Sequence, residues 1–555
     1  MYMGKQNFHP KGGIVVGYQR QSKHKEKLDI VNGDIHSLIL GDTGSGKTRS
    51  LWLQSIANIA LAGESMVLSD PKGEIFDYTR PYLESLGYNV YCLNFKTPTK
   101  SHGYNFLQGV INAINSDDIP RAIDLVWDIA SSLVPSSKGE PIWENGEASI
   151  IAGAIMATIY DNKDNPKLQN MTNVYHFISI MCKSRDKGEM LLDTYADTQG
   201  QSHPAVPLFA VVLLAPSRTR GSFFTAALAK LRLFTSPYVY NMTRRSDFEL
   251  KDIGHGKHAV FIVLPDGKET YNSLASLFAF QMYHALSDEA DRLGGRLKVR
   301  VHFMFEEFGN FTKLPGCAQM VTVARAKGII LNLVLQAFEQ LDKIYGKEDA
   351  NTIKANCGCL IYLRSSSPDT NAEISRRLGK YTTSSYGRSN STTASRSAQS
   401  GASMSLIARD MLTQEEVGRI ERPYVLVMLA GHPPAITMMP DISKWFFNDM
   451  LGMGDEEHNQ KLRMHRSSQI ADNRQIEIQW WDDLYNTWNQ KSTEKTIMQA
   501  MTGALKAALG GDTPNLTSET ENFDYPFEEI TDEDENPKSK AANVMAKNLK
   551  ALRNS

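Results

Sequence analysis

Residues 41–48, Gly-Asp-Thr-Gly-Ser-Gly-Lys-Thr (GDTGSGKT), decide the fold class of this chain. They match the phosphate-binding pattern G-x-x-x-x-G-K-[ST] at every fixed position. The mostly apolar segment IHSLIL (residues 35–40) precedes them, and residues 50–62 follow with a helical pattern. A buried strand, a glycine-rich turn and a helix in this order predict a nucleoside triphosphate site on a parallel sheet.

The residue types of this loop suit the chemistry of phosphate binding. Its glycines let backbone N–H groups turn toward the phosphates, and the helix N-terminus adds partial positive charge. Lys47 is expected to reach the β- and γ-phosphates, and Thr48 to hold Mg²⁺. ATP and Mg²⁺ are therefore the expected cofactors. The expected ligands in the loop are Gly41, Asp42, Thr43, Gly44, Ser45, Gly46, Lys47 and Thr48.

Short apolar segments rich in β-branched and aromatic residues recur along the chain, as in central strands of a parallel sheet. The predicted strands after the loop are residues 65–68, 89–93, 259–264, 301–305, 329–335, 360–363 and 424–428. A long helix is predicted over residues 271–292. The alternation of strands with helices indicates an α/β fold.

From about residue 112 to residue 215 the strand patterns nearly vanish and helical spacing takes over. This change predicts an all-α domain inserted into the α/β domain. We expect four parts: the first part of the nucleotide-binding domain (1–107), the all-α insertion (108–218), the second part of the nucleotide-binding domain (219–450) and a C-terminal extension (451–555).

Two later segments have biased compositions. Residues 382–405 contain nine Ser and four Thr, which favours a flexible surface loop. Residues 511–536 carry ten acidic residues and no Lys or Arg, which is typical of a disordered tail.

The composition excludes several classes of protein. Hydrophobic residues make up 41% and charged residues 22% of the 555 residues, so the chain is neither wholly disordered nor a small disulfide scaffold. The net charge of -2 provides no global basic field, so any nucleic-acid site must be a local patch or a channel lining. The five cysteines contain no CxxC pair, and free thiols indicate a cytoplasmic protein.

A P-loop needs an acidic partner at the end of another strand. Residues 301–307 (VHFMFEE) have this form, because an apolar strand delivers two carboxylates to its C-terminal edge, where ligands bind in open α/β sheets. Glu306 is expected to hold magnesium, and Glu307 to act as the general base that orients the attacking water. The alternative is an ordinary exposed acidic strand end.

Two further polar residues follow this acidic pair. Gln336 ends the next predicted strand, where it could sense the γ-phosphate or hold the water; the alternative is a solvent-facing glutamine. Arg325 lies between the two strands and is a candidate to stabilise transition-state charge in a neighbouring subunit. A surface salt bridge is the alternative for Arg325.

Taken in order, these motifs resemble the type IV coupling proteins, the TraG/TraD group. The resemblance rests on GDTGSGKT, SDPKGE (69–74), FEEFGNF (305–311) and the ARAKGI…LVLQAFEQL run (324–341). Trp143-Glu144, TRRSDF (243–248), IKANC (353–357) and RRLG (376–379) add to it. It extends from about residue 35 to residue 440, roughly three quarters of the chain.

The resemblance implies a RecA-like P-loop NTPase domain with a parallel central sheet and an inserted all-α domain, assembling as a homo-hexamer. Such proteins recruit the relaxase–DNA complex and use ATP to help move it to a type IV secretion channel in conjugation. It assigns Lys47 and Thr48 to the nucleotide, Glu306 and Glu307 to magnesium and the base, Gln336 to the sensor and Arg325 to the trans arginine. Asp70 and Lys72 then lie near the nucleotide.

Two departures from the family pattern bear on function. The family's acidic box usually reads Asp-Glu, and the extra methylene of Glu306 moves that carboxylate by about 1.5 Å, which favours weak or conditional hydrolysis. The family also usually carries N-terminal transmembrane helices. No apolar run here reaches the roughly 18–20 residues that span a bilayer. Either the sequence is cut short or a separate membrane protein supplies the anchor; we favour the second, with the chain peripheral at the inner face of the membrane.

DNA contacts and competing functions complete the expectations. A basic stretch (Arg218, Arg220, Lys230, Arg232, Arg244, Arg245) and Arg388 with Arg396 are candidates for binding single- or double-stranded DNA. The helical insertion is expected to face relaxosome proteins. The alternatives to a DNA-stimulated motor are a nucleotide-gated substrate receptor with little hydrolysis and an FtsK-like DNA translocase.

Overall fold

A computed structural model of the chain describes most residues up to 451 and several short pieces after them. The described residues are 10–22, 25–134, 141–184, 189–265, 271–392, 398–445, 448–451, 457, 460–461, 477–482, 484–491, 493, 498 and 501–502. They belong to two compact units. The first contains residues 1–178 and 204–480, and the second contains residues 179–203 and 481–555.

The first unit is built on a nine-stranded sheet in the order β13-β12-β9-β3-β8-β7-β4-β6-β5. Its strands are β3 (Ser37–Gly41), β4 (Ser65–Asp70), β5 (Asn89–Asn94), β6 (His258–Val263), β7 (Val301–Phe305), β8 (Ile329–Leu335), β9 (Cys359–Arg364), β12 (Tyr424–Leu429) and β13 (Ala435–Met438). All neighbours from β9 to β5 are parallel, while β12 and β13 are antiparallel. The predicted α/β class and parallel central sheet are confirmed.

Helices connect these strands and cover the sheet. The connecting helices are α1 (Leu53–Leu61), α2 (Glu74–Ser85), α11 (Asn272–Arg292), α12 (Cys317–Val323), α13 (Glu339–Tyr345), α14 (Lys347–Asn356), α15 (Pro368–Leu378) and α16 (Gln414–Gly418). Every residue of β3, β4, β7 and β8 is buried, which explains why these strands are continuous apolar runs rather than alternating ones.

A block of helices separates β5 from β6 in the sequence. Its helices in the first unit include α3 (Gln108–Asn115), α4 (Ile119–Leu133), α5 (Pro141–Tyr160), α8 (Ala210–Leu214), α9 (Ser217–Leu231) and α10 (Pro237–Thr243), and α6 (Met171–Met181) starts there. Helix α5 is buried almost throughout its second half, as its apolar sequence predicts. Among the helices in the described part of the chain, none has the length and apolarity needed to cross a bilayer.

The second unit has its own small set of packed elements. Helix α7 (Leu191–Gln199) follows an isolated bridge between Ser184 and Met190. The ring of Tyr195 lies 4.9 Å from that of Trp488, and the Lys183 ammonium lies 4.1 Å from the centre of the Tyr485 ring. Tyr485 and Trp488 of the predicted C-terminal extension therefore pack within this unit. The acidic segment 511–536 lies outside the described residues.

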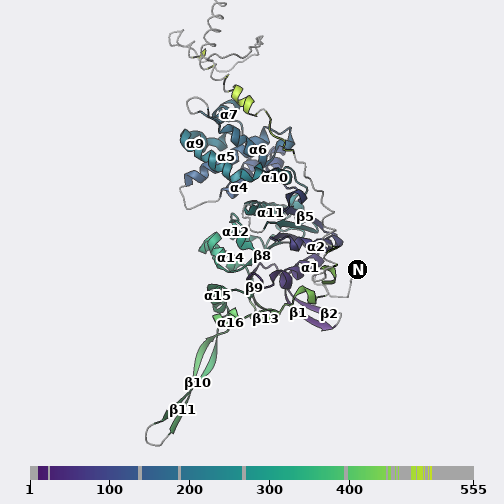
Figure 1. Cartoon of the computed structure of the whole chain (residues 1–555), viewed down its shortest axis with the longest axis vertical. Coiled ribbons are helices and arrows are strands. Elements are labelled where there is room, and N and C mark those ends of the chain that lie inside the picture. The colour runs from purple at the N-terminus through teal and green to yellow at the C-terminus, as the bar shows by residue number, and fades with distance from the viewer. Residues whose placement is uncertain are drawn as a thin grey trace, which may run out of the picture. The chain divides into compact units, whose positions relative to one another are not determined.

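The Ser/Thr-rich segment is not the flexible loop that we expected. Strands β10 (Lys380–Thr392) and β11 (Ala398–Asp410) form a long antiparallel hairpin, visible as two paired arrows in Figure 1. Its register runs without a break from the Lys380–Asp410 pair to the Thr392–Ala398 pair. Thr and Tyr favour extended backbone, and pairing satisfies every second main-chain group, so low complexity did not imply irregular structure.

A second hairpin, β1 (Ile14–Ser22) with β2 (Lys25–Val31), was not predicted. Its first strand joins the core next to α1, where the Gly13 N–H donates to the Asn58 side chain at 3.0 Å. The Val15 N–H donates to Ser55 Oγ at 3.1 Å. These bonds tie the start of the described chain to the helix that follows the phosphate loop.

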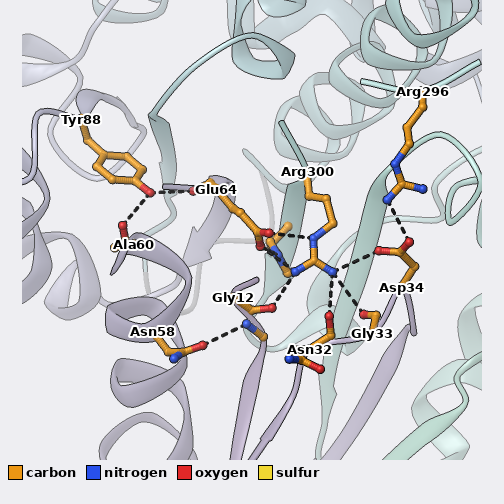
Figure 2. Close-up of polar contacts among 12 residues, drawn as sticks. Gly12, Asn32, Gly33, Asp34, Asn58, Ala60, Glu64, Tyr88, Arg296 and Arg300 are labelled. Carbon is orange, nitrogen blue, oxygen red and sulfur yellow. Dashed lines mark hydrogen bonds and ion pairs between the residues drawn. The ribbon is translucent and has the colours of Figure 1, made fainter. Parts of the chain in front are cut away.

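The amino ends of β4 and β7 are fixed by a buried ionic network (Figure 2). Glu64 accepts from Arg300 at 2.8 and 2.9 Å and contacts His302 Nε2 at 2.8 Å. The same guanidinium reaches Asp34 at 3.1 Å and the Gly12 carbonyl at 2.7 Å. Since Arg300 directly precedes β7, this network sets the register of the strand that ends at the acidic pair.

Candidate nucleotide-binding site

The phosphate loop continues directly from the buried end of β3. The Asp42 N–H donates to the Arg364 carbonyl of β9 at 2.9 Å, and the Ser45 N–H returns to the Asp42 carbonyl at 3.0 Å. Gly44 and Gly46 have φ of 80° and 87°, left-handed values that side chains disfavour. The sequence motif therefore folds into the tight turn that it predicts, followed by the helical turn Thr48–Trp52 and then α1.

Lys47 lies within its own loop. Its ammonium donates to the carbonyl oxygens of Gly41 and Asp42, the latter at 3.0 Å, and the side chain is only 8% exposed. Burial lowers the pKa of Lys47, while the nearby Glu306 and Glu307 carboxylates act in the opposite direction. The cation is thus held where a phosphate group would take over its hydrogen bonds.

Thr48 and Glu306 meet although 258 positions separate them in the sequence. Thr48 Oγ1 donates to Glu306 Oε1 at 2.6 Å, and Ser69 Oγ donates to the Glu306 carbonyl at 2.8 Å. The phosphate loop after β3 and the end of β4 therefore both contact Glu306, the former at its carboxylate and the latter at its main-chain carbonyl. Burial raises the pKa of Glu306, the hydrogen bond from Thr48 lowers it, and the Glu307 charge raises it further.

The donor set at this point fits Mg²⁺. A hydroxyl and a carboxylate in direct contact are oxygen ligands of the kind that this ion prefers. The Ser45 hydroxyl is also buried without a hydrogen-bond partner in the described part of the chain. Thr48 and Glu306 are therefore the residues that could hold the metal, and Ser45 offers a further polar atom toward the ligand.

Glu307 occupies an unusual backbone conformation. It has φ 53° and ψ 45°, in the left-handed region that non-glycine residues seldom adopt. Its carboxylate accepts from Asn310 Nδ2 at 2.9 Å, and its carbonyl accepts from the Asn310 N–H at 2.8 Å. Such a conformation costs roughly 1–3 kcal/mol and is often found at active sites. It turns Glu307 away from the β7 direction at the point where the site begins.

Asp70 is more enclosed than the sequence suggested. It is 1% exposed, and its two carboxylate oxygens accept from the N–H groups of Gly73 and Phe76 at 2.8 Å each. Burial raises the pKa of Asp70 to about 7, these two bonds oppose the rise, and the Glu306 charge adds to it. Asp70 thus caps the first turn of α2, while Lys72 is exposed and its charge acts on Lys47 and Glu306.

The remaining two predicted residues lie at different edges of the sheet. Gln336 directly follows β8, at the same edge as the phosphate loop; its N–H donates to Gln340 Oε1 at 2.8 Å, and its carbonyl accepts from Ser365 Oγ at 3.1 Å. Arg325 is exposed and lies in the turn between α12 and the start of β8. Because β8 runs parallel to β3, Arg325 belongs to the opposite edge, away from the phosphate loop of its own chain.

Sequence reasoning missed Arg422, which lies just before β12. Its guanidinium donates to the carbonyl oxygens of Gly44 and Ser45 at 2.5 and 2.8 Å. A Cβ on Gly46 would approach that guanidinium to 2.4 Å, so the loop and Arg422 fit closely together. No local motif marks this arginine, because its partner loop lies more than 370 positions earlier.

A pocket of about 200 Å³ lies beside the phosphate loop on the β9–β12 side. Its lining residues are Gly44, Ser45, Ser50, Leu363, Arg364, Glu421, Arg422, Pro423, Tyr424, Val425 and Met439. The lining combines the Tyr424 ring and apolar side chains with two arginines and Glu421, directly beside the loop that is expected to hold the phosphates.

Comparisons with known proteins identify a family that this chain resembles over most of its length. Residues 2–464 match the model of a family described as type IV secretory system conjugative DNA transfer. The chain is 25% identical over 471 residues to the conjugal transfer protein TraG of Escherichia coli, covering 78% of this chain and 71% of TraG. It is 22% identical over 418 residues to VirD4 of Agrobacterium fabrum, covering 73% of this chain and 58% of VirD4.

Solved structures of the plasmid coupling protein TrwB share the fold. The TrwB complex with the ATP analogue ADPNP has a TM-score of 0.54 and 20% identity, covering 74% of this chain and 86% of TrwB. A sulphate complex of TrwBdeltaN70 has a TM-score of 0.52 and 19% identity, covering 73% and 85%. The predicted RecA-like P-loop NTPase fold with a helical domain is thereby confirmed.

Proposed function

Because this chain belongs to the family of type IV secretory system conjugative DNA transfer proteins, we propose that it is an ATP-driven coupling protein of bacterial conjugation. In this role it recruits the relaxase–DNA complex and helps move it to a type IV secretion channel. The observation that carries the proposal is the contact between Thr48 and Glu306 at the end of a complete phosphate loop, with Glu307 next to it.

The chain's own residues divide the work of hydrolysis. Lys47 exchanges its bonds with the loop carbonyls for bonds to the β- and γ-phosphates, and the backbone N–H groups of the loop hold the rest of the triphosphate. When bound through Thr48 and Glu306, Mg²⁺ neutralises charge that develops on the phosphate oxygens. Glu307 orients the attacking water and accepts its proton, and Gln336 senses the γ-phosphate.

Two further roles, for Asp70 with Lys72 and for Arg325, complete the proposed site. Asp70 orders the turn that presents Lys72 to the nucleotide, since its carboxylate is used entirely within that turn. Arg325 acts as the trans arginine of a neighbouring subunit in a homo-hexamer, which agrees with its exposure and its position away from its own loop.

The proposed partners are DNA, relaxase, channel subunits and a separate membrane anchor protein, with the chain at the inner face of the cell membrane. Exposed cations on and after α9, Arg218, Lys230 and Arg232, are available for DNA phosphates. In contrast, Arg220 donates to the Ala215 carbonyl and Arg245 pairs with Asp247, while Arg396 lies outside the described residues. The proposed domain limits lie after residues 107, 218 and 450, and the helices of the block continue beyond residue 218 to α10.

A nucleotide-gated receptor with little hydrolysis is the second candidate. The observation that favours it is the glutamate at position 306, where the acidic box of the resembled family usually has aspartate, because the longer side chain moves the carboxylate by about 1.5 Å. In a receptor of this kind, nucleotide binding changes the docking of cargo without rapid turnover.

Measuring ATP hydrolysis with and without DNA separates the two candidates. Wild type is compared with Lys47→Ala and Glu307→Gln, and with the exposed controls Lys163→Ala and Glu348→Gln. A motor gives turnover that rises with DNA, disappears in the first two variants and persists in both controls. If wild type binds ATP through Lys47 but turns over slowly with every DNA tested, the motor is refuted in favour of the receptor.

A further inference from the structure

Residues 477–480 lie on the helical block, far in sequence from the helices that they contact. The Gln479 N–H donates to the hydroxyl of Tyr240 on α10 at 3.2 Å. Asn173 Nδ2, on α6, donates to the Gln479 carbonyl at 3.0 Å. The ring of Trp480 lies 5.0 Å from that of His176, one turn along α6. We call Asn173, His176 and Tyr240 the peptide seat, and residues 477–480 the strap.

The two hydrogen bonds of the peptide seat depend little on the sequence of the segment that it binds. Both hydrogen bonds go to main-chain atoms of Gln479, one to its N–H and one to its carbonyl. The third contact is a ring-to-ring contact, which an aromatic residue at the next position satisfies. Reading the backbone by hydrogen bonds and one side chain by a ring surface is a recurring mode of peptide recognition.

The two sides of this contact differ in how firmly they are held. Asn173 is fully buried and Tyr240 is 2% exposed; Asn173 also donates to the Leu168 carbonyl at 3.1 Å. In the strap, by contrast, Glu477 and Gln479 are exposed, and Trp480 is 38% exposed. A preformed acceptor surface with an exposed, lightly attached guest can release that guest at low cost.

We propose that the peptide seat is a docking site for an extended segment of a protein cargo with an aromatic residue, which exchanges with the chain's own strap. This inference rests on the proposed function, since the protein part of the relaxase–DNA complex is the partner that coupling would bring to the helical block. The strap then acts as a built-in competitor, and only a cargo segment that also offers an aromatic ring and an extended backbone displaces it.

The test uses a fluorescent peptide with the sequence of residues 475–482 (QIEIQWWD) as the probe for the full chain. The strap variant carries Gln479→Pro and Trp480→Ala. Proline has no N–H, so the hydrogen bond to the Tyr240 hydroxyl is lost, while the residues of the peptide seat are unchanged. The tethered strap competes at a high effective concentration, so the strap variant should bind the probe at least about tenfold more tightly than wild type.

Two further variants identify the seat. Tyr240→Phe in the strap variant should weaken probe binding about fivefold, since one hydrogen bond is lost. Tyr238→Phe is the matched control on the same helix, because Tyr238 is 50% exposed, and it should leave binding unchanged. A probe with both tryptophans replaced by alanine should not bind.

The outcomes separate this inference from the proposed function. Equal probe binding by wild type and the strap variant, or binding that ignores Tyr240→Phe, would overturn the peptide seat. Nucleotide binding by each variant verifies that the chain is folded. If the chain shows DNA-stimulated ATP turnover but the probe test fails, only the peptide seat is refuted and the proposed function stands. If the probe test succeeds but the chain shows no DNA-stimulated ATP turnover, only the ATP-driven motor is refuted.

Discussion

Strands β4 and β7 lie side by side, and the buried carboxyl groups at their amino ends have pKa values shifted in the opposite direction from those at their carboxyl ends. At the amino ends, burial alone would raise the pKa of Glu64, but His302 and Arg300 bring it below its ordinary value. At the carboxyl ends, burial raises the pKa of Glu306 and brings that of Asp70 to about 7, with the two acids repelling each other. The amino ends pair a buried carboxylate with cations, whereas the carboxyl ends place two buried carboxyl groups near each other.

The amino edge of the sheet thus contributes to stability, whereas the carboxyl edge forms the candidate nucleotide site. The amino edge is satisfied within the chain, since Arg300 reaches Glu64, Asp34 and the main-chain carbonyls of Gly12, Asn32 and Gly33 (Figure 2). The carboxyl edge places Glu306 and Asp70 where an added cation would relieve repulsion. We therefore expect substitutions at the two edges to change stability in opposite directions, as functional sites commonly sacrifice stability.

The largest expected effect is at the amino edge. Arg300→Met should lower the free energy of unfolding by about 3–5 kcal/mol, because Glu64 is left buried without its main cation. Urea unfolding monitored by circular dichroism measures this loss. The double variant with Glu64→Gln should recover part of it, and an equally unstable double variant would contradict the pairing.

At the carboxyl edge, Glu306→Gln should separate activity from stability. The amide keeps an oxygen for the Thr48 hydroxyl but loses the charge, so ATP turnover should fall by about 10²–10³-fold. The midpoint of urea unfolding without nucleotide should rise, corresponding to about 1 kcal/mol. A variant that is both inactive and less stable than wild type would break the proposed contrast.

Asp70 gives the contrast a pH dependence. Its carboxyl has a pKa of about 7 in the folded chain against an ordinary value of 3.8, so between these values the folded state holds a proton that the unfolded state has lost. Stability from this group therefore decreases as pH rises, by about 1.4 kcal/mol per pH unit. Urea unfolding at pH 5, 6 and 7 should show wild type losing stability relative to Asp70→Asn, and parallel curves would refute the shift.

Arg422 tests whether the phosphate loop depends on a distant residue. Arg422→Leu should weaken ATP binding about tenfold, because two bonds that fix the Gly44 and Ser45 carbonyls are lost. Arg419→Leu, close by in sequence, is the control. Calorimetric titration with ATP measures both variants, and equal affinities would remove Arg422 from the site.

The smallest expected effect sharpens the comparison within the amino edge. Arg296 pairs with Asp34 at 2.8 Å, but its side chain is 44% exposed, against 6% for Arg300. Arg296→Ala should therefore change the free energy of unfolding by less than about 1 kcal/mol. A loss as large as that of Arg300→Met would mean that burial does not decide the strength of this edge.

The sequence alone determined the phosphate loop, the α/β class and the positions of the buried strands along the chain, because these depend on local chemistry. A glycine pattern allows the turn at Gly44 and Gly46, and apolar runs such as residues 329–335 must be buried. The same reasoning predicted that the ends of β3 and β7 would meet, since the carboxyl ends of parallel strands share one edge. The bond between Thr48 and Glu306 agrees with it.

Only the tertiary structure decided the contacts that join distant segments. The contact of Arg422 with the phosphate loop has no local pattern, since the carbonyl oxygens that it binds lie 377 and 378 positions earlier in the sequence. The β10–β11 hairpin shows the same limit: residues 382–405 resembled a loop in composition, but their described parts, residues 382–392 and 398–405, lie in strands that pair with each other. Local chemistry fixes what a segment can form, and long-range pairing fixes what it does form.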